Sequence, residues 1–399
     1  MRPYSIEVPS RGIVEFLGLK RNLVLLCLAI VAIGAGEELW MRFLPKYLEV
    51  LGATAMMIGL FDALKTLLGA VYAWPGGAAI DRFGHRGSLL LFTALSIGGY
   101  ALVVAVPRWE AVVFGTFLFL AWSDLSLPAL FTMVAVNLPP EKHSMGIGLQ
   151  SLIKRVPILI GPVLGGLLID RLGVAGGVRT GAAVSIAAGL FGLAIQSRMA
   201  DPGHITSIGP GLIETIRRFE PRLRRLLFSD ILIRFCERIP FAWVVIYAMD
   251  RVGVSGEQVG VLTAIEVFAA MICYVPAARF ADRYGKEPFV IATFLFFTAF
   301  PVMLYFAHSF RFLVAVFAIR GLKEFGEPAR KALIIAYAGG ANRGRTVGAY
   351  YLMRDTIVTS GSFVGAALWS LGAGFNFWVA AALGAAGTAA YIVTRPRTP

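Results

Sequence analysis

The chain has 399 residues, of which 57% are hydrophobic and only 15% are charged, and its mean hydropathy is +0.73. Soluble globular proteins carry about 25% charged residues, so this composition excludes an ordinary soluble domain. A formal net charge of +13 can indicate a nucleic-acid partner. The positions of the basic residues, considered below, predict a membrane topology instead and no nucleic acid.

Apolar segments long enough to cross a bilayer recur along the whole chain. A spanning helix needs about 20 predominantly apolar residues, and the segment from Phe375 to Val393 is one example. The pattern predicts an all-α integral membrane protein with twelve transmembrane helices. The predicted spans are 22–50, 54–80, 87–106, 110–138, 143–170, 176–197, 224–250, 256–280, 288–307, 311–338, 344–371 and 375–394.

The basic residues are divided unevenly between the two sides of the predicted membrane. An even number of spans puts both chain ends on one side, which then receives 22 Lys and Arg residues, while the other side receives six. Cytoplasmic loops carry the excess of Lys and Arg in membrane proteins. We therefore expect a multi-pass protein of the cell (inner) membrane, in contact with the lipid bilayer, with both termini in the cytoplasm.

Sequence signals for processing, metals and catalysis are absent. The first apolar run is long and continues into a full span, so no cleavable signal peptide is expected. Cys27, Cys236 and Cys273 fall in separate spans and predict packing residues, with no disulfide framework or metal site. The sequence has no phosphate-binding Gly-x4-Gly-Lys-Ser/Thr loop, so no ATP-driven pump is expected. It also has no His/Cys cluster, and we expect no enzyme, no cofactor and no metal.

A short turn occurs twice, each time between two apolar spans. The first copy, residues 77–86, reads GAAIDRFGHR, and the second, residues 278–286, reads ARFADRYGK. A shift of about 200 residues also relates other positions in the two halves. It matches Glu37-Glu38 with Glu237-Arg238, Asp124 with Glu324, Pro128 with Pro328, Lys154-Arg155 with Arg354-Asp355, and Gly161 with Gly361.

The repeat divides the chain into two pseudo-symmetric six-helix bundles joined by a polar linker. We place the first bundle at 1–198, the linker at 199–222 and the second bundle at 223–399. Within the linker, Leu212 to Phe219 has apolar residues at helical spacing and a basic face. This piece is either a short amphipathic helix on the anionic inner leaflet or a plain connecting segment.

Twelve spans in two sets of six, a central linker and the turn Gly77-x-x-x-Asp81-Arg82-x-Gly84-x-Arg86 resemble the major facilitator superfamily. The resemblance covers essentially the whole chain. The second turn departs from the pattern because Ala278 stands where the family has Gly. The resemblance implies two bundles around a midplane site that opens alternately to either side of the membrane.

The two turns are candidate gating elements. An aspartate beside a helix end can face the positive N-terminus of a helix in the other bundle. Asp81 would then contact the start of span 11 near Gly344, and Asp282 the start of span 5 near His143; alternatively, both are solvated loop charges. The candidate gating residues are Gly77, Asp81, Arg82, Gly84, Arg86, Asp282, Arg283 and Gly285.

Span 5 contains a glycine- and proline-rich pattern that resembles the antiporter signature of the same superfamily. Small residues let another helix approach closely, and proline bends a span. The pattern departs from the signature at Pro157, where the family has Gly. The candidate packing residues are Gly148, Pro157, Gly161, Pro162, Gly165 and Gly166.

Ionisable residues are unusually frequent inside the predicted spans. A charge at the bilayer centre costs at least about 2.5–3.5 kcal/mol, so most of these groups must pair or face water. Asp62 and Lys65 have the spacing of a local helical pair, and Arg42, Asp230, Arg234 and Arg320 are expected near span ends. The candidate substrate- or proton-binding residues are Glu37, Glu38, Asp124, Lys154, Arg155, Glu237, Arg238, Glu266, Lys323, Glu324, Glu327, Arg354 and Asp355.

Carboxylates are the candidate proton carriers, because all four histidines fall in loops or at span ends. A buried carboxyl group holds a proton more readily away from cations than beside one. A glutamate that alternates between those surroundings can therefore couple transport to protons. Glu37, Glu38 and Glu237 are the best placed.

These features predict a monomeric secondary transporter that exports a small organic compound in exchange for protons. A second interpretation is a proton symporter or facilitator for an anionic metabolite, favoured by cations such as Lys154 and Arg238. A third is a membrane scaffold or sensor without transport. The charge facing the central pocket would discriminate between cationic and anionic substrates.

Overall fold

The structure is a computed structural model, and it describes residues 21–125, 143–200, 212–338 and 343–394. Within these ranges the regular secondary structure is entirely helical. Several helices begin where the sequence supplies a capping side chain. The Thr54 and Ser309 hydroxyls accept hydrogen bonds from the first turns of their helices, and Ser255 forms a capping box with Gln258.

The first half contains two very long helices that each include a sharp bend. At Gly84 in α5 and at Gly173 in α8 the backbone has φ 72°, which glycine adopts without a steric penalty. Each bend joins two consecutive crossings. The helices of this half are α2 (Arg21–Glu38), η1 (Met41–Phe43), α3 (Leu44–Val50), α4 (Ala55–Val71), α5 (Ala73–Ala105), α6 (Trp109–Leu120), the π-helical η2 (Ala121–Leu125) and α8 (His143–Gln196).

The second half begins with a short helix that lies within the linker sequence. Its helices are α9 (Leu212–Arg217), α10 (Pro221–Phe241), α11 (Trp243–Asp250), α12 (Gly256–Tyr284), α13 (Glu287–Tyr305), α14 (Phe310–Leu322), α15 (Glu327–Ala338), α16 (Arg343–Leu371) and α17 (Ala373–Thr394). Breaks divide equivalent spans in the two halves, since α2 ends before α3 much as α10 ends before α11.

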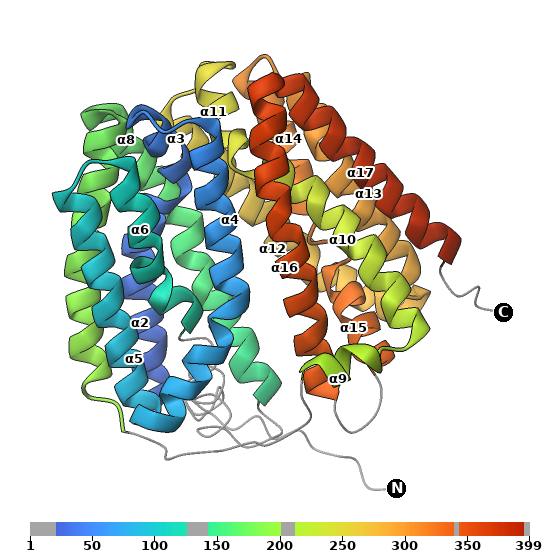
Figure 1. The fold of residues 1–399 in the computed structure, drawn as a ribbon, viewed down its shortest axis with the longest axis horizontal. Coiled ribbons are helices and arrows are strands. Elements are labelled where there is room, and N and C mark those ends of the chain that lie inside the picture. The colour runs from blue at the N-terminus through green and yellow to red at the C-terminus, as the bar shows by residue number, and fades with distance from the viewer. Residues whose placement is uncertain (1–20, 126–142, 201–211, 339–342, 395–399) are drawn as a thin grey trace, which may run out of the picture.

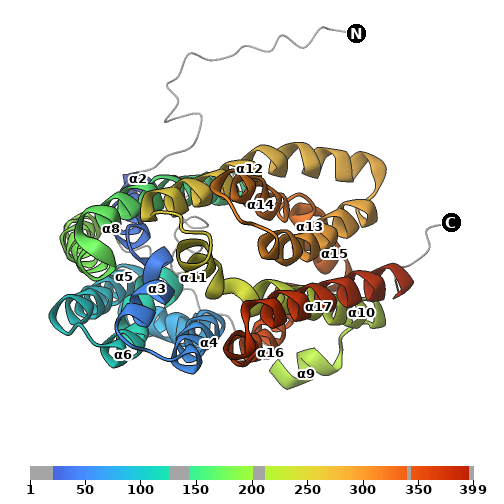
Figure 2. The same cartoon turned by 90° about the horizontal axis from the view of Figure 1, so that it is seen from above.

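The helices form two bundles that lie side by side, as the sequence predicted. Figure 1 shows the first half from α2 to α8 on one side and the second half from α10 to α17 on the other. Seen from above, the same two groups flank a central zone in which α4 faces α16 and α8 lies beside α12 (Figure 2). The predicted all-α fold with two pseudo-symmetric bundles is confirmed.

The outer surface of the described helices suits contact with lipid. Large apolar side chains are exposed, among them Phe114 (65%) and Phe191 (60%), and a soluble protein rarely exposes apolar surface so widely. In the described part of the chain, six helical stretches are long and apolar enough to cross a membrane. They are Val24–Val50, Arg82–Ala105, Ile153–Gln196, Gly256–Tyr274, Glu287–Tyr305 and Ala373–Thr394.

Of the remaining predicted spans, 110–138 lies partly outside the described residues, and the others are interrupted or carry more charge. The predicted span 54–80 divides into α4 and the start of α5 at Tyr72, and the predicted span 311–338 divides at residues 323–326 between α14 and α15. In the second break, hydrogen bonds between residues three apart replace those of the α-helix, which join residues four apart. One example runs from the Glu324 N–H to the Gly321 carbonyl.

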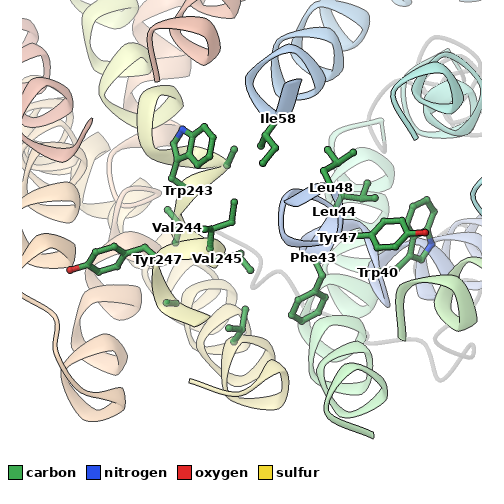
Figure 3. Packing of buried hydrophobic residues seen from close by; sticks show 14 of the residues in the cluster. Trp40, Phe43, Leu44, Tyr47, Leu48, Ile58, Trp243, Val244, Val245 and Tyr247 are labelled. Atoms are coloured by element: carbon green, nitrogen blue, oxygen red, sulfur yellow. The ribbon is translucent and has the colours of Figure 1, made fainter. Parts of the chain in front are cut away.

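The two bundles are in firm contact at the end that carries α3 and α11, which we call the closed end. Figure 3 shows Phe43, Leu44 and Leu48 of the first bundle facing Val244 and Val245 of the second, and all belong to one buried apolar cluster. In α4, a Cβ on Gly59 would overlap with Ala366 of α16. Toward the opposite end, where α9 lies, α4 and α16 diverge (Figure 1).

Candidate functional site

Among the described residues, two adjoining hollows lie between the bundles at the centre of the molecule, and a third adjoins them within the first bundle. The first has a volume of about 310 Å³ and is lined by α4, η2, α10 and α16. The second, of about 190 Å³, lies toward the closed end beside Met41 and Val245, and the third, of about 300 Å³, lies within the first bundle beside Trp122. Cavities of this size accept small organic molecules.

Charged side chains line these hollows in nearly equal numbers of each sign. Together the three hollows are bounded by seven basic and six acidic residues. The basic residues are Arg42, Lys65, Lys154, Arg234, Arg238, Arg320 and Arg354, and the acidic residues are Glu37, Glu38, Asp62, Asp124, Glu237 and Asp355. Pocket charge alone therefore favours neither a purely cationic nor a purely anionic substrate.

A continuous chain of ion pairs runs through the second bundle. At one end of it, Glu266 accepts hydrogen bonds from Lys323 at 3.4 Å and lies 3.3 Å from the Arg320 Nε. Lys323 also donates to Glu237 at 2.8 Å, and Glu237 accepts a second bond from Arg234 at 2.8 Å. Each of these acids is therefore neutralised by at least one cation.

The chain continues into a fully buried cluster around Asp230 and Arg330. Both side chains are only 1% exposed and form an ion pair, and Arg330 also binds Glu327 through its Nε at 2.8 Å. The Asp230 carboxylate accepts further bonds from the Tyr350 hydroxyl at 2.9 Å and Arg354 at 3.3 Å. Good geometry with several partners is what makes such burial tolerable.

Among the described residues, three ion pairs connect the two bundles across the central region. Arg42 of η1 donates to Glu266 of α12 at 2.8 Å. Arg238 of α10 donates to Asp62 of α4 at 3.2 Å. The third contact is looser, because the nearest oxygen of Glu324 lies 3.9 Å from Arg155.

Two sequence expectations about these charges are wrong. Asp62 pairs with Arg238 and accepts from the Ser362 hydroxyl at 2.6 Å, instead of pairing with Lys65, because α4 packs directly against α16. Asp230 and Arg320 are buried, with 0% and 4% exposure, and do not lie at exposed span ends. Arg42 and Arg234 likewise make inward ion pairs.

Glu37 differs from the other buried acids in its partners. The residue is 6% exposed, and its carboxylate accepts hydrogen bonds from the Tyr100 hydroxyl at 2.5 Å and the Ser123 hydroxyl at 2.9 Å. Within the part of the chain that the structure describes, Glu37 has no Lys or Arg nitrogen within 4.0 Å. Its direct hydrogen-bond partners are neutral hydroxyls, whereas Glu237 lies beside two cations.

The predicted gating turns are described only in part. Gly84 and Gly285 both have positive φ values, 72° and 92°, so the need for glycine at this point of each turn is shown. Arg82, Asp282 and Arg283 are exposed, and Arg86 is half-buried. The side-chain surroundings of Gly77 and Asp81 lie outside the described part, as do those of the proposed target of Asp81 at Gly344 and of Asp282 at His143.

The glycines of span 5 lie where α8 touches its neighbours most closely. A Cβ on Gly161 would overlap with Glu38 and one on Gly165 with the Leu39 carbonyl, both within the first bundle. A Cβ on Gly166 would overlap with the Gly256 backbone of the second bundle. Pro162 contacts Gly260 and Pro157 contacts Gly34 in the same way, while the surroundings of Gly148 lie outside the described part.

Sequence reasoning did not single out Asp170, which joins the bundles at the closed end. Its two carboxylate oxygens accept hydrogen bonds from the Gly256 N–H at 2.7 Å and the Glu257 N–H at 2.8 Å, at the start of α12. A carboxylate is favoured there because the first N–H groups of a helix lack internal partners and carry partial positive charge. The sequence signal that could have indicated this contact is the position of Asp170, four residues after Gly166 and so on the same face of the helix.

Comparisons with known proteins agree with this architecture. The curated relatives include multidrug resistance protein MdtG of Escherichia fergusonii, 23% identical over 361 residues that cover 88% of each chain. MdtG of Yersinia enterocolitica is 31% identical over 162 residues, 39% of this chain and 38% of the relative.

Solved structures share the fold at low sequence identity. A POT family transporter has a TM-score of 0.75 at 14% identity, covering 94% of this chain and 95% of that one. A point mutant of the nucleoside transporter NupG has a TM-score of 0.76 at 12% identity, covering 93% and 99%. The model of the Major Facilitator Superfamily matches residues 26–233 and 226–399. With matches over both halves, this chain belongs to the Major Facilitator Superfamily of membrane transporters.

Proposed function

We propose that the chain exports a small organic compound across the cytoplasmic membrane in exchange for protons, with both termini in the cytoplasm. The multidrug resistance relatives and the antiporter-like pattern of α8 support export. In this orientation the closed end faces outward. Alternating access then requires the contacts between α8 and α12 to separate while the opposite end closes.

The observation that carries proton coupling is the position of Glu37. A carboxyl group bound only by hydroxyls can be neutral or charged at modest cost, whereas one held by cations stays ionised. Glu37 also borders the third hollow together with Glu38 and Asp124, so a change in its charge acts on the substrate space. Glu237, fixed between Arg234 and Lys323, is better suited to a structural role.

The experiment uses the purified protein in liposomes that contain a pH-sensitive dye. With an imposed pH gradient, a panel of organic ions is screened for compounds that accumulate inside the liposomes. Exchange is recognised when the dye reports that protons leave the liposomes as the compound enters. Glu37→Gln keeps the size of the side chain but cannot ionise. We expect this variant to exchange the compound between equal pools and to lose accumulation against a gradient.

The matched control is Glu110→Gln, which removes an exposed acid outside the central hollows. Normal pH-driven accumulation by Glu37→Gln would exclude this residue as the coupling site. If an imposed pH gradient never drives the wild-type protein, a facilitator is the better description.

A further inference from the structure

The three hollows meet at a small group of charged side chains in the first bundle. Lys65 lines the first and second hollows, Glu38 the second and third, and Asp124 the first and third. Lys154 completes the group from α8, on the wall of the third hollow. A molecule in the middle of the site would therefore face two acids and two bases from four different elements.

Like Glu37, these four side chains lack ion-pair partners among the described residues, but unlike Glu37 they also lack hydroxyl partners there. Among the described residues, none of the four has an oppositely charged atom within 4.0 Å. The charges of the second bundle, by contrast, are engaged with one another from Glu266 through Glu237 to Asp230. These four charges of the first bundle are therefore available to bind a ligand, whereas the charges of the second bundle are held in place by one another.

Charges that have no ion pair among the described residues are unfavourable within a membrane protein unless water or a ligand compensates them. All four are half-buried at the edge of the hollows, so water can reach them when the site is empty. A ligand that displaces this water without replacing its interactions would bind weakly. A ligand of a single charge would satisfy one sign and leave the other desolvated.

We propose that the transported compound is dipolar, with a cationic and an anionic group on one small molecule. Asp124 and Glu38 receive its ammonium or amidinium group, and Lys65 and Lys154 receive its carboxylate or another oxyanion. The hollows, at about 190 to 310 Å³ each, leave room for an apolar body between the charges. This inference rests on the proposed transport function and adds the class of substrate.

The test measures binding to the protein in lipid nanodiscs, without any gradient. The probes are phenylalanine and the dipeptide leucylphenylalanine, each compared with its N-acetyl form, which is only anionic, and its amide form, which is only cationic. We expect the free forms to raise the melting temperature, with dissociation constants at least about tenfold lower than those of the blocked forms. That ratio corresponds to about 1.4 kcal/mol.

Variants assign each charge to its side of the ligand. Lys65→Gln should bind the free form no better than the amide, and Asp124→Asn should bind it no better than the N-acetyl form. Lys154→Gln and Glu38→Gln are the second pair of variants if either of the first fails to fold. Arg108→Gln, which changes an exposed pair outside the hollows, should keep the full preference.

Equal affinity for free and blocked forms, or no stabilisation by any of the six probes, would overturn the assignment. Because no pH gradient is applied, loss of the preference leaves proton-coupled export untouched. Conversely, a wild-type protein that ignores pH gradients but prefers the dipolar probes would overturn the coupling and keep the substrate class.

Discussion

At the scale of single residues, the buried charges have two different chemical situations. Asp230 and Arg330 are completely buried and satisfied by several partners, whereas Lys65 and Asp124 border open space without an ion pair among the described residues. Charges of the first kind keep the second bundle rigid, because breaking one pair leaves its partner uncompensated. Charges of the second kind remain free for a substrate.

Replacing Asp230 by Asn should therefore destabilise the protein strongly. The amide keeps the size of the side chain but leaves Arg330 and Arg354 facing each other without the anion that joins them. We expect a loss of about 3–5 kcal/mol, the range seen when one partner of a buried pair is removed. Thermal unfolding in detergent should show a clearly lower melting temperature.

The control for this change is Asp282→Asn, an exposed aspartate in the second gating turn. Exposed substitutions usually alter stability by no more than about 0.5 kcal/mol. Equal melting temperatures for the two variants would show that the Asp230 cluster contributes nothing beyond a surface charge.

At the scale of helices, small residues of α8 set how closely the bundles approach. Gly166 touches the backbone of Gly256, so at this point the two helices meet without side chains between them. Close approach of this kind is typical of small residues at membrane helix interfaces. Gly161 and Gly165 make comparable contacts with α2 and the turn after it, inside one bundle.

Gly166→Ala should consequently weaken the closed end without unfolding the protein. The added methyl would overlap with the Gly256 carbonyl, so the bundles must separate there. In a background without native cysteines, a cysteine at Val358, which lines the first hollow, reports access. We expect faster modification by an impermeant thiol reagent added on the side of the closed end.

Gly348→Ala is the matched control, because a Cβ at that exposed position of α16 meets nothing within 4 Å. Its modification rate should equal that of the parent protein. An unchanged rate in Gly166→Ala would mean that the helices absorb the methyl by small shifts.

The start of α12 provides a second contact between the bundles at the closed end. The Asp170 carboxylate binds two N–H groups at the start of α12, and replacing it by Asn keeps one acceptor oxygen but removes the charge. With spin labels at Leu172 and Arg251, we expect Asp170→Asn to increase the fraction of molecules with a long distance across the closed end.

Glu110→Gln serves as the charge control for Asp170, since it also removes an exposed acid beside a helix start. Identical distance distributions in the parent, Glu110→Gln and Asp170→Asn would assign Asp170 a local role only.

At the scale of the whole molecule, transport depends on the balance between contacts at the two ends. The closed end is held by the apolar cluster of α3 and α11, by the pair Lys46 and Asp250, and by Asp170. Asp81, in the turn at the opposite end, is the predicted counterpart. Each aspartate would favour the conformation in which its own end is closed.

Asp81→Asn should therefore act in the direction opposite to Asp170→Asn. With the same two spin labels, we expect it to reduce the fraction of molecules with an open α3–α11 end and to slow transport, while the melting temperature stays within a few degrees. A wild-type transport rate, or a shift in the same direction as Asp170→Asn, would contradict the role of Asp81 as a latch.

The sequence by itself determined the fold, the duplication and the family. These were predicted from local or periodic features: the length of the apolar segments, the turns at Asp81 and Asp282, and the shift of about 200 residues. Such features are visible in the sequence because a helix in a bilayer must satisfy its own backbone hydrogen bonds within one continuous apolar segment. Gly84 and Gly285 could be assigned to tight turns for the same local reason.

Only the tertiary structure decided which charges pair. Asp62 has Lys65 three residues away but binds Arg238, which is 176 positions distant. Glu37 and Glu237 match in the repeat, but Glu37 binds neutral hydroxyls and Glu237 binds cations. Ion pairing depends on distances of a few ångströms between side chains on different helices, and helix packing sets those distances. Asp170 follows the same rule, since its partner is the backbone of another bundle.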